Sequence, residues 1–179
     1  MYILYKDDYD VNYERLEIER AQFADAEEVL ALQKLAYRSE AEINNDFTIQ
    51  PLTQTGEETA EDIKKQTVLK VSAVNGKNGS NTLKAAKKII ASVRGYQEKD
   101  SCFIGKLIVH PEYQNMGIGS ELLGIIEKHF SCAARYELFT GGKSAGNIRL
   151  YERSGYKPIK IKKINENFNL VFMEKRADG

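Results

Sequence analysis

The segment from residue 107 to residue 120 has the pattern of a site that binds phosphate through its backbone. An apolar, strand-like run reaches Pro111, a short polar turn contains Gly117 and Gly119, and an apolar-periodic stretch typical of a helix follows. Glycine lets a backbone approach a ligand closely, and the N–H groups that begin a helix present partial positive charge to an anion. These residues therefore predict the binding of a phosphorylated ligand.

Two nucleotide-binding motifs are incomplete in this chain. A dinucleotide fingerprint requires a third glycine where Leu122 stands, and an acidic residue about 20 residues farther on. Residues 142–144, Gly-Lys-Ser, follow a strand-like run, but a P-loop also requires a glycine where Glu137 stands. A nucleotide-binding P-loop protein stays open as a minor alternative. A tight turn that requires glycine only for its backbone conformation, without a ligand, also stays open as an alternative.

A longer constellation is more specific than the glycines alone. Gln114 precedes Gly117 and Gly119 in the spacing Gln-x-x-Gly-x-Gly, and residues 147–156 form a second block that begins with Asn, carries a tyrosine and ends in Gly-Tyr. In this order and separation, the two blocks resemble the acetyl-CoA signature and the second hallmark of the GNAT superfamily of N-acetyltransferases. The resemblance is strong over residues 89–156.

The resemblance implies an N-acetyltransferase that moves the acetyl group of acetyl-CoA to a primary amine of a small molecule or protein, by direct attack in a ternary complex. It also implies that the strand at residues 107–109 splays from its neighbour near a bulge and pairs with the pantetheine arm. A backbone N–H of Ile108 or Val109 would face the thioester oxygen. The residues expected to contact the cofactor are Leu107, Ile108, Val109, Gln114, Asn115, Met116, Gly117, Ile118, Gly119, Ser120, Asn147 and Tyr151.

Tyr151 is the expected catalytic residue, because the resemblance makes it the proton donor to the departing CoA thiolate. The alternative is a packed helix aromatic, since Ile148 and Tyr151 share a helical face. Asn147 could hydrogen-bond the pantetheine or act as a helix N-cap. Gln114 could reach the phosphates or cap the loop, and Ser120 could add a hydroxyl contact.

The amine must arrive neutral, and the residue that removes its proton is not evident. An alkylamine with a pKa near 10.4 lies about 3.4 units above neutrality, so its deprotonation costs roughly 4.6 kcal/mol. Many family members carry a Glu on the signature strand, whereas residues 103–106 have no carboxylate. Glu98 is a reserve candidate, His110 is more typical of loop packing, and deprotonation through water is the default. A non-catalytic acyl-CoA-binding module remains the main alternative function.

Acidic residues are frequent in the segments expected to shape the acceptor site. As a hypothesis, this acidity favours a cationic acceptor such as a polyamine, an amino sugar or a lysine side chain, and a solvated acidic face is the alternative. The residues concerned are Glu40, Glu42, Asp46, Glu57, Glu58, Glu61 and Asp62.

Periodicity and capping signals predict the elements that must position these residues. A half-buried strand is expected at residues 16–21, a helix from a capping box at Asp25 and Glu28, a polar loop at 39–54 with room for a short helix, and a helix from Thr55 to about Gln66. Further strands are expected at 68–74, within 84–98, in the segment that ends at residue 109, and at 136–140, 156–164 and 168–174. A hairpin turn is expected at 75–81, and helices are expected after Gly119 and at 145–154.

This order matches the one that the GNAT resemblance implies. The expected fold is α+β, in α/β/α layers, with a mixed, mostly antiparallel sheet of about seven strands and helices on both faces. With 179 residues, a single domain over residues 1–179 is expected, with residues 1–13 as an N-terminal extension. The tyrosine-rich extension could pack on the chain's own sheet or on a second copy, so a homodimer is possible.

Composition narrows the partners and the compartment. Because 26 basic residues balance 26 acidic ones, neither nucleic acid nor an anionic membrane is expected as a partner. No apolar run approaches the length of a membrane span, and the N-terminus lacks the features of a secretory signal. Cys102 and Cys132 are expected to be buried free thiols in a cytoplasmic protein, and the Cys and His residues show no metal-ligand spacing.

Overall fold

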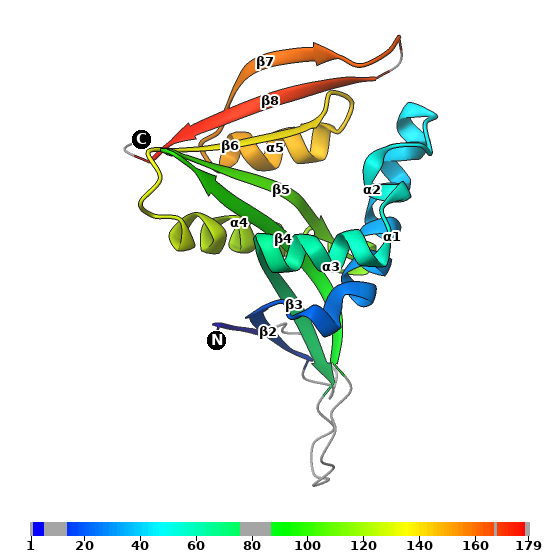
Figure 1. Cartoon of the computed structure of the whole chain (residues 1–179), viewed down its shortest axis with the longest axis vertical. Coiled ribbons are helices and arrows are strands. Elements are labelled where there is room, and N and C mark those ends of the chain that lie inside the picture. Colours follow the sequence, from blue (N-terminus) through cyan, green and yellow to red (C-terminus); the bar gives the residue numbers. More distant parts are fainter. Residues whose placement is uncertain (1, 6–13, 76–86, 167, 178–179) are drawn as a thin grey trace, which may run out of the picture.

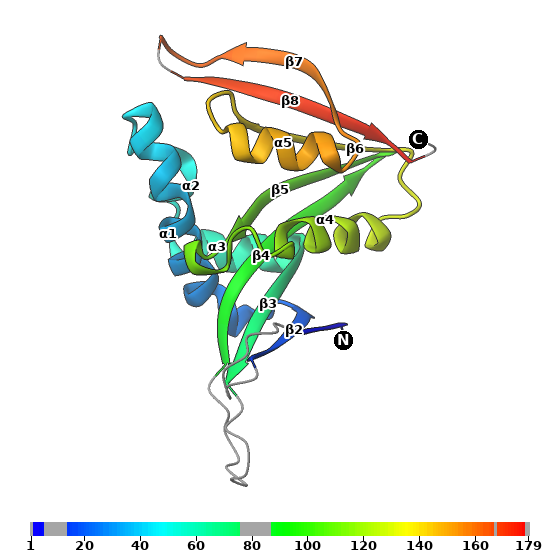
Figure 2. The same cartoon turned by 180° about the vertical axis from the view of Figure 1, so that it is seen from behind.

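A computed structural model describes residues 2–5, 14–75, 87–166 and 168–177. The described residues form one mixed sheet of eight strands in the order β1-β2-β3-β4-β5-β6-β8-β7. Every neighbouring pair is antiparallel except β5 and β6, which are parallel. Helices α1 and α3 lie over one face of the sheet, and α4 and α5 lie over the other (Figures 1 and 2). The predicted α+β fold with helices on both faces is confirmed.

The element bounds follow the predicted order closely. The strands are β1 (Tyr2–Tyr5), β2 (Glu14–Arg20), β3 (Thr67–Asn75), β4 (Lys87–Glu98), β5 (Ser101–Val109), β6 (Arg135–Gly141), β7 (Lys157–Lys163) and β8 (Asn169–Arg176). The helices are α1 (Ala26–Asn44), α2 (Gln50–Thr53), α3 (Gly56–Lys65), α4 (Ile118–His129) and α5 (Ala145–Arg153), with 3-10 turns η1 (Phe23–Asp25) and η2 (Pro111–Tyr113). The strand beyond the seven expected is β1, which pairs with β2. Most of the turn expected at 75–81 lies outside the described residues.

Helix α1 is longer than its sequence indicated. We expected a loop from residue 39, but the helix continues to Asn44 and ends at Asn45, which adopts a left-handed conformation with φ 50°. Ala41 is completely buried, and Asn44 is buried as well. The packing of this last turn therefore outweighs its polar composition, and the loop prediction for residues 39–44 is wrong.

The N-terminal capping signals were only partly right. The box at Thr55 and Glu58 opens α3 as predicted, because each residue accepts a hydrogen bond from the other's backbone N–H. At α1 the helix begins after Asp25, but the expected box does not form. Asp25 instead pairs with Lys70 at 2.7 Å, and Glu28 accepts a hydrogen bond from the backbone N–H of Ile89 on β4 at 2.7 Å. Both carboxylates thus join η1 and α1 to the sheet.

Strand β5 is covered on both faces at its C-terminal end, fully at Ile108 and partly at Leu107 and Val109. Ile108 packs beneath α1 in a cluster with Val29 and Leu32. Leu107 and Val109 pack toward the opposite cluster, which contains the buried apolar side chains of α4. The uninterrupted apolar run at residues 107–109 therefore indicates burial on both faces, as expected.

A bulge interrupts β5 three residues before its end. Ser92 of β4 pairs with Ile108, but Arg94 pairs with Gly105, so β5 carries one more residue than β4 in this interval. Lys106 lies in the interval with φ 48°, in the left-handed region. The bulge that the family resemblance implied is confirmed.

Strand β5 also separates from β6. Their parallel pairing joins residues 101–103 to residues 135–137 and goes no farther. Beyond these three pairs the two strands diverge, and the gap between their C-terminal ends widens toward α1 (Figures 1 and 2). The implied splay is therefore confirmed, and within the described residues the far end of β5 has no strand on this side.

Two further sequence predictions can be compared with the structure. Cys102 is a buried free thiol, but Cys132, in the turn after α4, is exposed. The prediction of burial is therefore wrong for Cys132, because the short segment between α4 and β6 lies at the surface. In the described part of the chain, no helix combines the length and the apolar character needed to cross a membrane.

Candidate active site

The loop between β5 and α4 has the geometry of an anion site at a helix N-terminus. Asn115 and Gly117 have φ values of 63° and 83°, and Gly117 is the N-cap of α4. A Cβ at position 117 would meet no atom within 4 Å, so glycine is needed for its backbone conformation and the space beside it is open. Asn115, Met116 and Ser120 are exposed around this space. The N–H groups of the first helical turn have no partner within the helix, so they suit a phosphate.

The remaining loop residues divide between the core and the loop itself. Gln114 donates from Nε2 to the carbonyl of Val109 at 3.2 Å, so its side chain caps the end of β5, which was one of its two expected roles. The side chain of Ile118 is buried, which leaves only its backbone N–H for a ligand. A Cβ at Gly119 would lie 3.5 Å from Leu150 of α5, an ordinary contact distance. Gly119 thus lies where α4 and α5 approach each other.

Helix α5 holds Tyr151 on the same side of the sheet as this loop. The ring is 6% exposed and meets the ring of Tyr156 edge to face, with centroids 6.0 Å apart. Burial, with a contribution from the nearby carboxyl of Glu40, raises the pKa of Tyr151 well above its usual range. Its hydroxyl therefore keeps its proton at any physiological pH and can serve as a donor.

Asn147 lies one turn before Tyr151. The N-cap of α5 is Ser144, so the N-cap alternative for Asn147 is wrong. Its Nδ2 instead donates to Thr140 Oγ1 on β6 at 3.3 Å, while the residue stays exposed. This contact ties the start of α5 to the strand that borders the splay.

Helix α1 brings two groups close to Tyr151: Tyr37, which the sequence did not assign to the site, and Glu40, which was one of the acidic residues expected near the acceptor. Tyr37 and Glu40 both lie close enough to affect its electrostatics: the pKa of Tyr37 is raised by burial and then by Tyr151 and Glu40. Burial raises the pKa of the Glu40 carboxyl, against a smaller lowering by the nearby Ser144 hydroxyl and Gly141 N–H. A predicted helix that continued to Asn44 would have placed Tyr37 and Glu40 together, because residues 37, 40, 41 and 44 then share one helical face.

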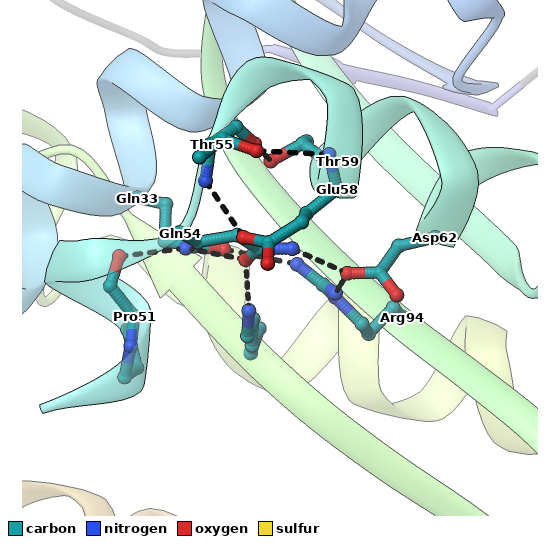
Figure 3. A network of polar contacts seen from close by, with 9 residues as sticks. Gln33, Pro51, Gln54, Thr55, Glu58, Thr59, Asp62 and Arg94 are labelled. Atoms are coloured by element: carbon teal, nitrogen blue, oxygen red, sulfur yellow. Dashed lines mark hydrogen bonds and ion pairs between the residues drawn. The ribbon is translucent and has the colours of Figure 1, made fainter.

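A buried polar network fastens α1 and α3 to the sheet beside the bulge (Figure 3). Arg94 of β4 is 8% exposed and forms an ion pair with Asp62 of α3, while its other terminal nitrogen donates to Gln33 at 2.9 Å. Gln54 accepts from Gln33 at 2.9 Å and donates to Asp62 at 2.6 Å. Lys106 also donates to Gln54. The network thus reaches the bulged residue of β5.

Within this network, the burial of the charged Lys106 side chain costs stability. Burial and the neighbouring charge of Arg94 lower its pKa from 10.5 to about 8. A lysine with a depressed native pKa opposes folding most strongly below that pKa, and the penalty fades as pH rises from about 8 to 10.5. Lys106→Met should therefore stabilise the fold by about 1 to 2 kcal/mol at pH 7, and remove the rise in stability over that pH window.

Urea unfolding of Lys106→Met at pH 7, 8.5 and 10 measures this effect. Gln54 Oε1 keeps its hydrogen bond from Gln33 in the variant, so no buried acceptor is left unpaired. Lys128→Met, on the exposed face of α4, is the matched control and should not change the pH dependence. A Lys106 variant less stable than the parent at pH 7 would contradict the expected penalty.

The other candidates for a base lie elsewhere. Glu98 is exposed and pairs with Ser101 at the β4–β5 turn, at the opposite end of the strand from Ile108, so the reserve candidate is not in position. His110 accepts a hydrogen bond from the N–H of Glu112 at 3.4 Å and lies 3.3 Å from Lys88 Nζ. These contacts match the loop-packing role expected for His110.

Most of the acidic residues expected near the acceptor already have other contacts. Glu42 pairs with Arg38 on α1, and Asp46 accepts from Thr48 within its own turn. Glu58 caps α3, Glu61 pairs with lysines of the same helix, and Asp62 belongs to the buried network. Of the seven, Glu40 is the residue whose carboxyl lies beside Tyr151.

Known proteins with similar sequences and folds agree with this arrangement. A sequence model of the acetyltransferase (GNAT) family matches residues 42–156, more than half of the chain. The ribosomal-protein-S18-alanine N-acetyltransferase from Escherichia coli has a similar fold, with a TM-score of 0.67, 16% identity, and 90% of this chain and 94% of that chain covered. No curated protein sequence matches the chain.

Two solved structures with similar folds contain the cofactor. PaiA N-acetyltransferase from Thermoplasma acidophilum in complex with coenzyme A gives a TM-score of 0.67 at 14% identity, with 90% of this chain and 98% of that chain covered. YncA from Salmonella typhimurium, with its cofactor acetyl-CoA, gives 0.64 at 17% identity, with 92% and 95% covered. At these identities the likeness concerns the fold. The family match, on a fold with the implied bulge and splay, means that this chain belongs to the acetyltransferase (GNAT) family.

Proposed function

We propose that this chain transfers the acetyl group of acetyl-CoA to a primary amine, which attacks the thioester directly in a ternary complex. The observation that carries the proposal is the separation of β5 from β6 beside a loop with open space at Gly117. A strand end without a neighbour can pair with an extended ligand, and free N–H groups at a helix start can hold its phosphates. Both features fit a pantetheine arm that ends in a pyrophosphate.

The cofactor would be held mainly by backbone groups. The N–H groups from Asn115 to Ser120 would hold the pyrophosphate, and the edge of β5 at residues 107–109 would pair with the pantetheine arm. Asn147, exposed at the start of α5, would add a side-chain contact. When bound, acetyl-CoA supplies an activated acetyl group. A backbone N–H of Ile108 or Val109 would polarise the carbonyl, a contribution typically worth about 3 kcal/mol.

Tyr151 would donate its proton to the leaving sulfur. The raised pKa keeps the hydroxyl protonated, so it has a proton to supply as negative charge develops on the leaving sulfur. The buried position between α5 and the core also keeps bulk water from the ring. In this proposal Tyr151 is the catalytic residue of the chain.

A thiol-release assay with acetyl-CoA tests the proposal. The panel would contain small amines, polyamines, amino sugars and lysine peptides, and products would be identified by mass spectrometry. One acetylated product formed well above the rate of hydrolysis would support the enzyme and name its acceptor. CoA binding without any product would favour a non-catalytic acyl-CoA-binding module. A melting temperature raised by ATP with magnesium, but not by CoA, would favour a nucleotide-binding protein.

Gly117→Ala tests the cofactor loop separately. Alanine at φ 83° is strained, and its methyl group would enter the open space assigned to the pyrophosphate. The variant should lose about 1 kcal/mol of stability and bind CoA roughly tenfold more weakly, as measured by calorimetry. Gly124→Ala, within α4 where a Cβ meets no atom within 4 Å, is the matched control and should bind CoA normally. Equal CoA affinity in both variants would contradict the assignment.

We also propose a cytoplasmic location and self-association. The free thiols of Cys102 and Cys132 fit a reducing compartment. Strand β7 is an edge of the sheet, and Ile159 and Ile161 on it are 56% and 66% exposed. An exposed apolar edge strand is a surface on which a second copy could pair.

A further inference from the structure

We infer that Glu40 receives the acceptor amine: its carboxylate binds the substrate ammonium and takes the proton that must leave before attack. This inference rests on the proposed function. It assigns a side chain to the step for which residues 103–106 offer no carboxylate. The carboxylate comes from α1, on the opposite face of the sheet from the cofactor loop (Figures 1 and 2).

Glu40 lies across the gap between β5 and β6. Helix α1 packs on β5 through the cluster that contains Ile108, and Tyr37 packs against the same cluster. From the next turn of α1, the Glu40 carboxyl contacts Gly141 at the end of β6 and Ser144 at the start of α5. The carboxylate is therefore placed where the two separated strand ends face each other, beside Tyr151.

Gly141 makes room for this carboxylate. A Cβ at position 141 would overlap Glu40 Oε1 and would lie 2.9 Å from Ser144 Oγ. Gly141 has no left-handed backbone conformation, so its own dihedral angles do not require glycine. A side chain at position 141 would therefore have to displace the Glu40 carboxylate. Glu40, Gly141 and Ser144 thus form one site, in which the carboxylate occupies the space beside Gly141.

The charge around Glu40 favours a cation. Among the described residues, Gly141 and Ser144 lie beside its carboxyl, and no lysine or arginine forms an ion pair with it. The titratable groups that face it are Tyr37 of α1 and Tyr151 of α5, and both remain neutral because burial raises their pKa values. Burial also raises the pKa of Glu40, which makes it a stronger base than an exposed glutamate. An ammonium would supply the missing counter-charge.

The proton and electron balance is complete with these groups. The ammonium gives one proton to Glu40, and the freed nitrogen lone pair forms the N–C bond to the acetyl carbonyl carbon. The C–S bond breaks, and the sulfur leaves with its electron pair and takes the proton of Tyr151. The second proton lost from the nitrogen returns to Tyr151, and Glu40 releases its proton to solvent. The sum is acetyl-CoA plus ammonium giving amide, CoA thiol and one proton.

Glu40→Gln tests the inference by kinetics, with Glu42→Gln as the matched control on the same helix. The acetylation of the best amine in the panel would be followed as kcat/KM from pH 5 to pH 10. Glu40 can accept a proton only when the pH exceeds the pKa of its carboxyl, which burial raises. The kcat/KM of the parent should therefore fall at the acid end of the profile, at a pH above the usual pKa range of glutamate. Glu40→Gln should lower kcat/KM at pH 7 by at least roughly tenfold and remove that limb, with recovery at high pH where free amine is abundant.

A second variant and a binding measurement distinguish a role of Glu40 as the base from a purely structural role. Gly141→Ala displaces the carboxylate without removing it, so it should reproduce the kinetic loss. Calorimetry of spermidine and of a lysine peptide, each added to the CoA complex, should give roughly tenfold weaker binding to Glu40→Gln than to Glu42→Gln. Unchanged amine binding, or an unchanged pH profile with a lower melting temperature, would overturn the inference and leave Glu40 a structural tie. Absence of acetylation by the parent, with amine binding still dependent on Glu40, would overturn the proposed function alone.

Discussion

Tyr151→Phe should lower the turnover number by roughly 10² to 10³-fold while leaving the affinity for CoA within about twofold of the parent. The ring would still pack edge to face on Tyr156, so the fold and the cofactor loop are preserved. In the proposed mechanism, the variant would lose the proton that neutralises the departing thiolate, a group whose charge develops only in the transition state. Thiol-release kinetics give the turnover number, and calorimetry gives the CoA affinity.

Tyr156→Phe is the matched control for this experiment. Tyr156 belongs to the same buried cluster, but its hydroxyl donates to Glu127 at 2.8 Å, away from the proposed chemistry. Its removal should reduce stability by about 1.5 to 3 kcal/mol, the range for a hydrogen bond to a charged group, without a large change in turnover. A Tyr151→Phe enzyme that turns over like the parent would show that Tyr151 is only a packed aromatic.

Asp62→Ala should reduce the free energy of unfolding by about 3 to 5 kcal/mol. The substitution leaves Arg94 buried without its counter-ion, and it removes the acceptor of the Gln54 amide. Both groups then lose contacts that water cannot easily replace, because Arg94 and Gln54 are buried. Urea unfolding followed by circular dichroism measures the loss.

Glu61→Ala provides the comparison within the same helix. Glu61 is exposed and pairs with Lys64 and Lys65, so its removal should leave the free energy of unfolding nearly unchanged. If Asp62→Ala and Glu61→Ala unfold at the same urea concentration, Arg94 must find water or another partner, and the network is less important than its burial suggests.

Local patterns were sufficient to predict the order of strands and helices. The Asn-led block became α5, the glycine turn became the start of α4, and the apolar run at 107–109 proved buried on both faces. These features depend on residues close in sequence. The end of α1 did not follow, because the burial of Ala41 depends on distant parts of the chain.

The polar contacts of the site were less predictable for the same reason. Arg94 is 32 positions from Asp62, and Lys106 is 52 positions from Gln54. Nothing in the composition of β4 or β5 distinguishes a buried cation from an exposed one. Glu40 was one of seven acidic residues, and only the fold separates it from the others, by placing Gly141 and Ser144 against it.

The three residue pairs between β5 and β6 have a consequence for how the protein opens. The sheet is continuous on each side of this seam, but few ladder hydrogen bonds cross it. The C-terminal unit, from β6 to β8 with α5, should therefore exchange its amide hydrogens through partial opening at a lower free energy than the rest of the sheet. A ligand that fills the seam as an added strand would close this route. The rigidity of the protein would then depend on whether the cofactor is bound, and so on the cofactor concentration.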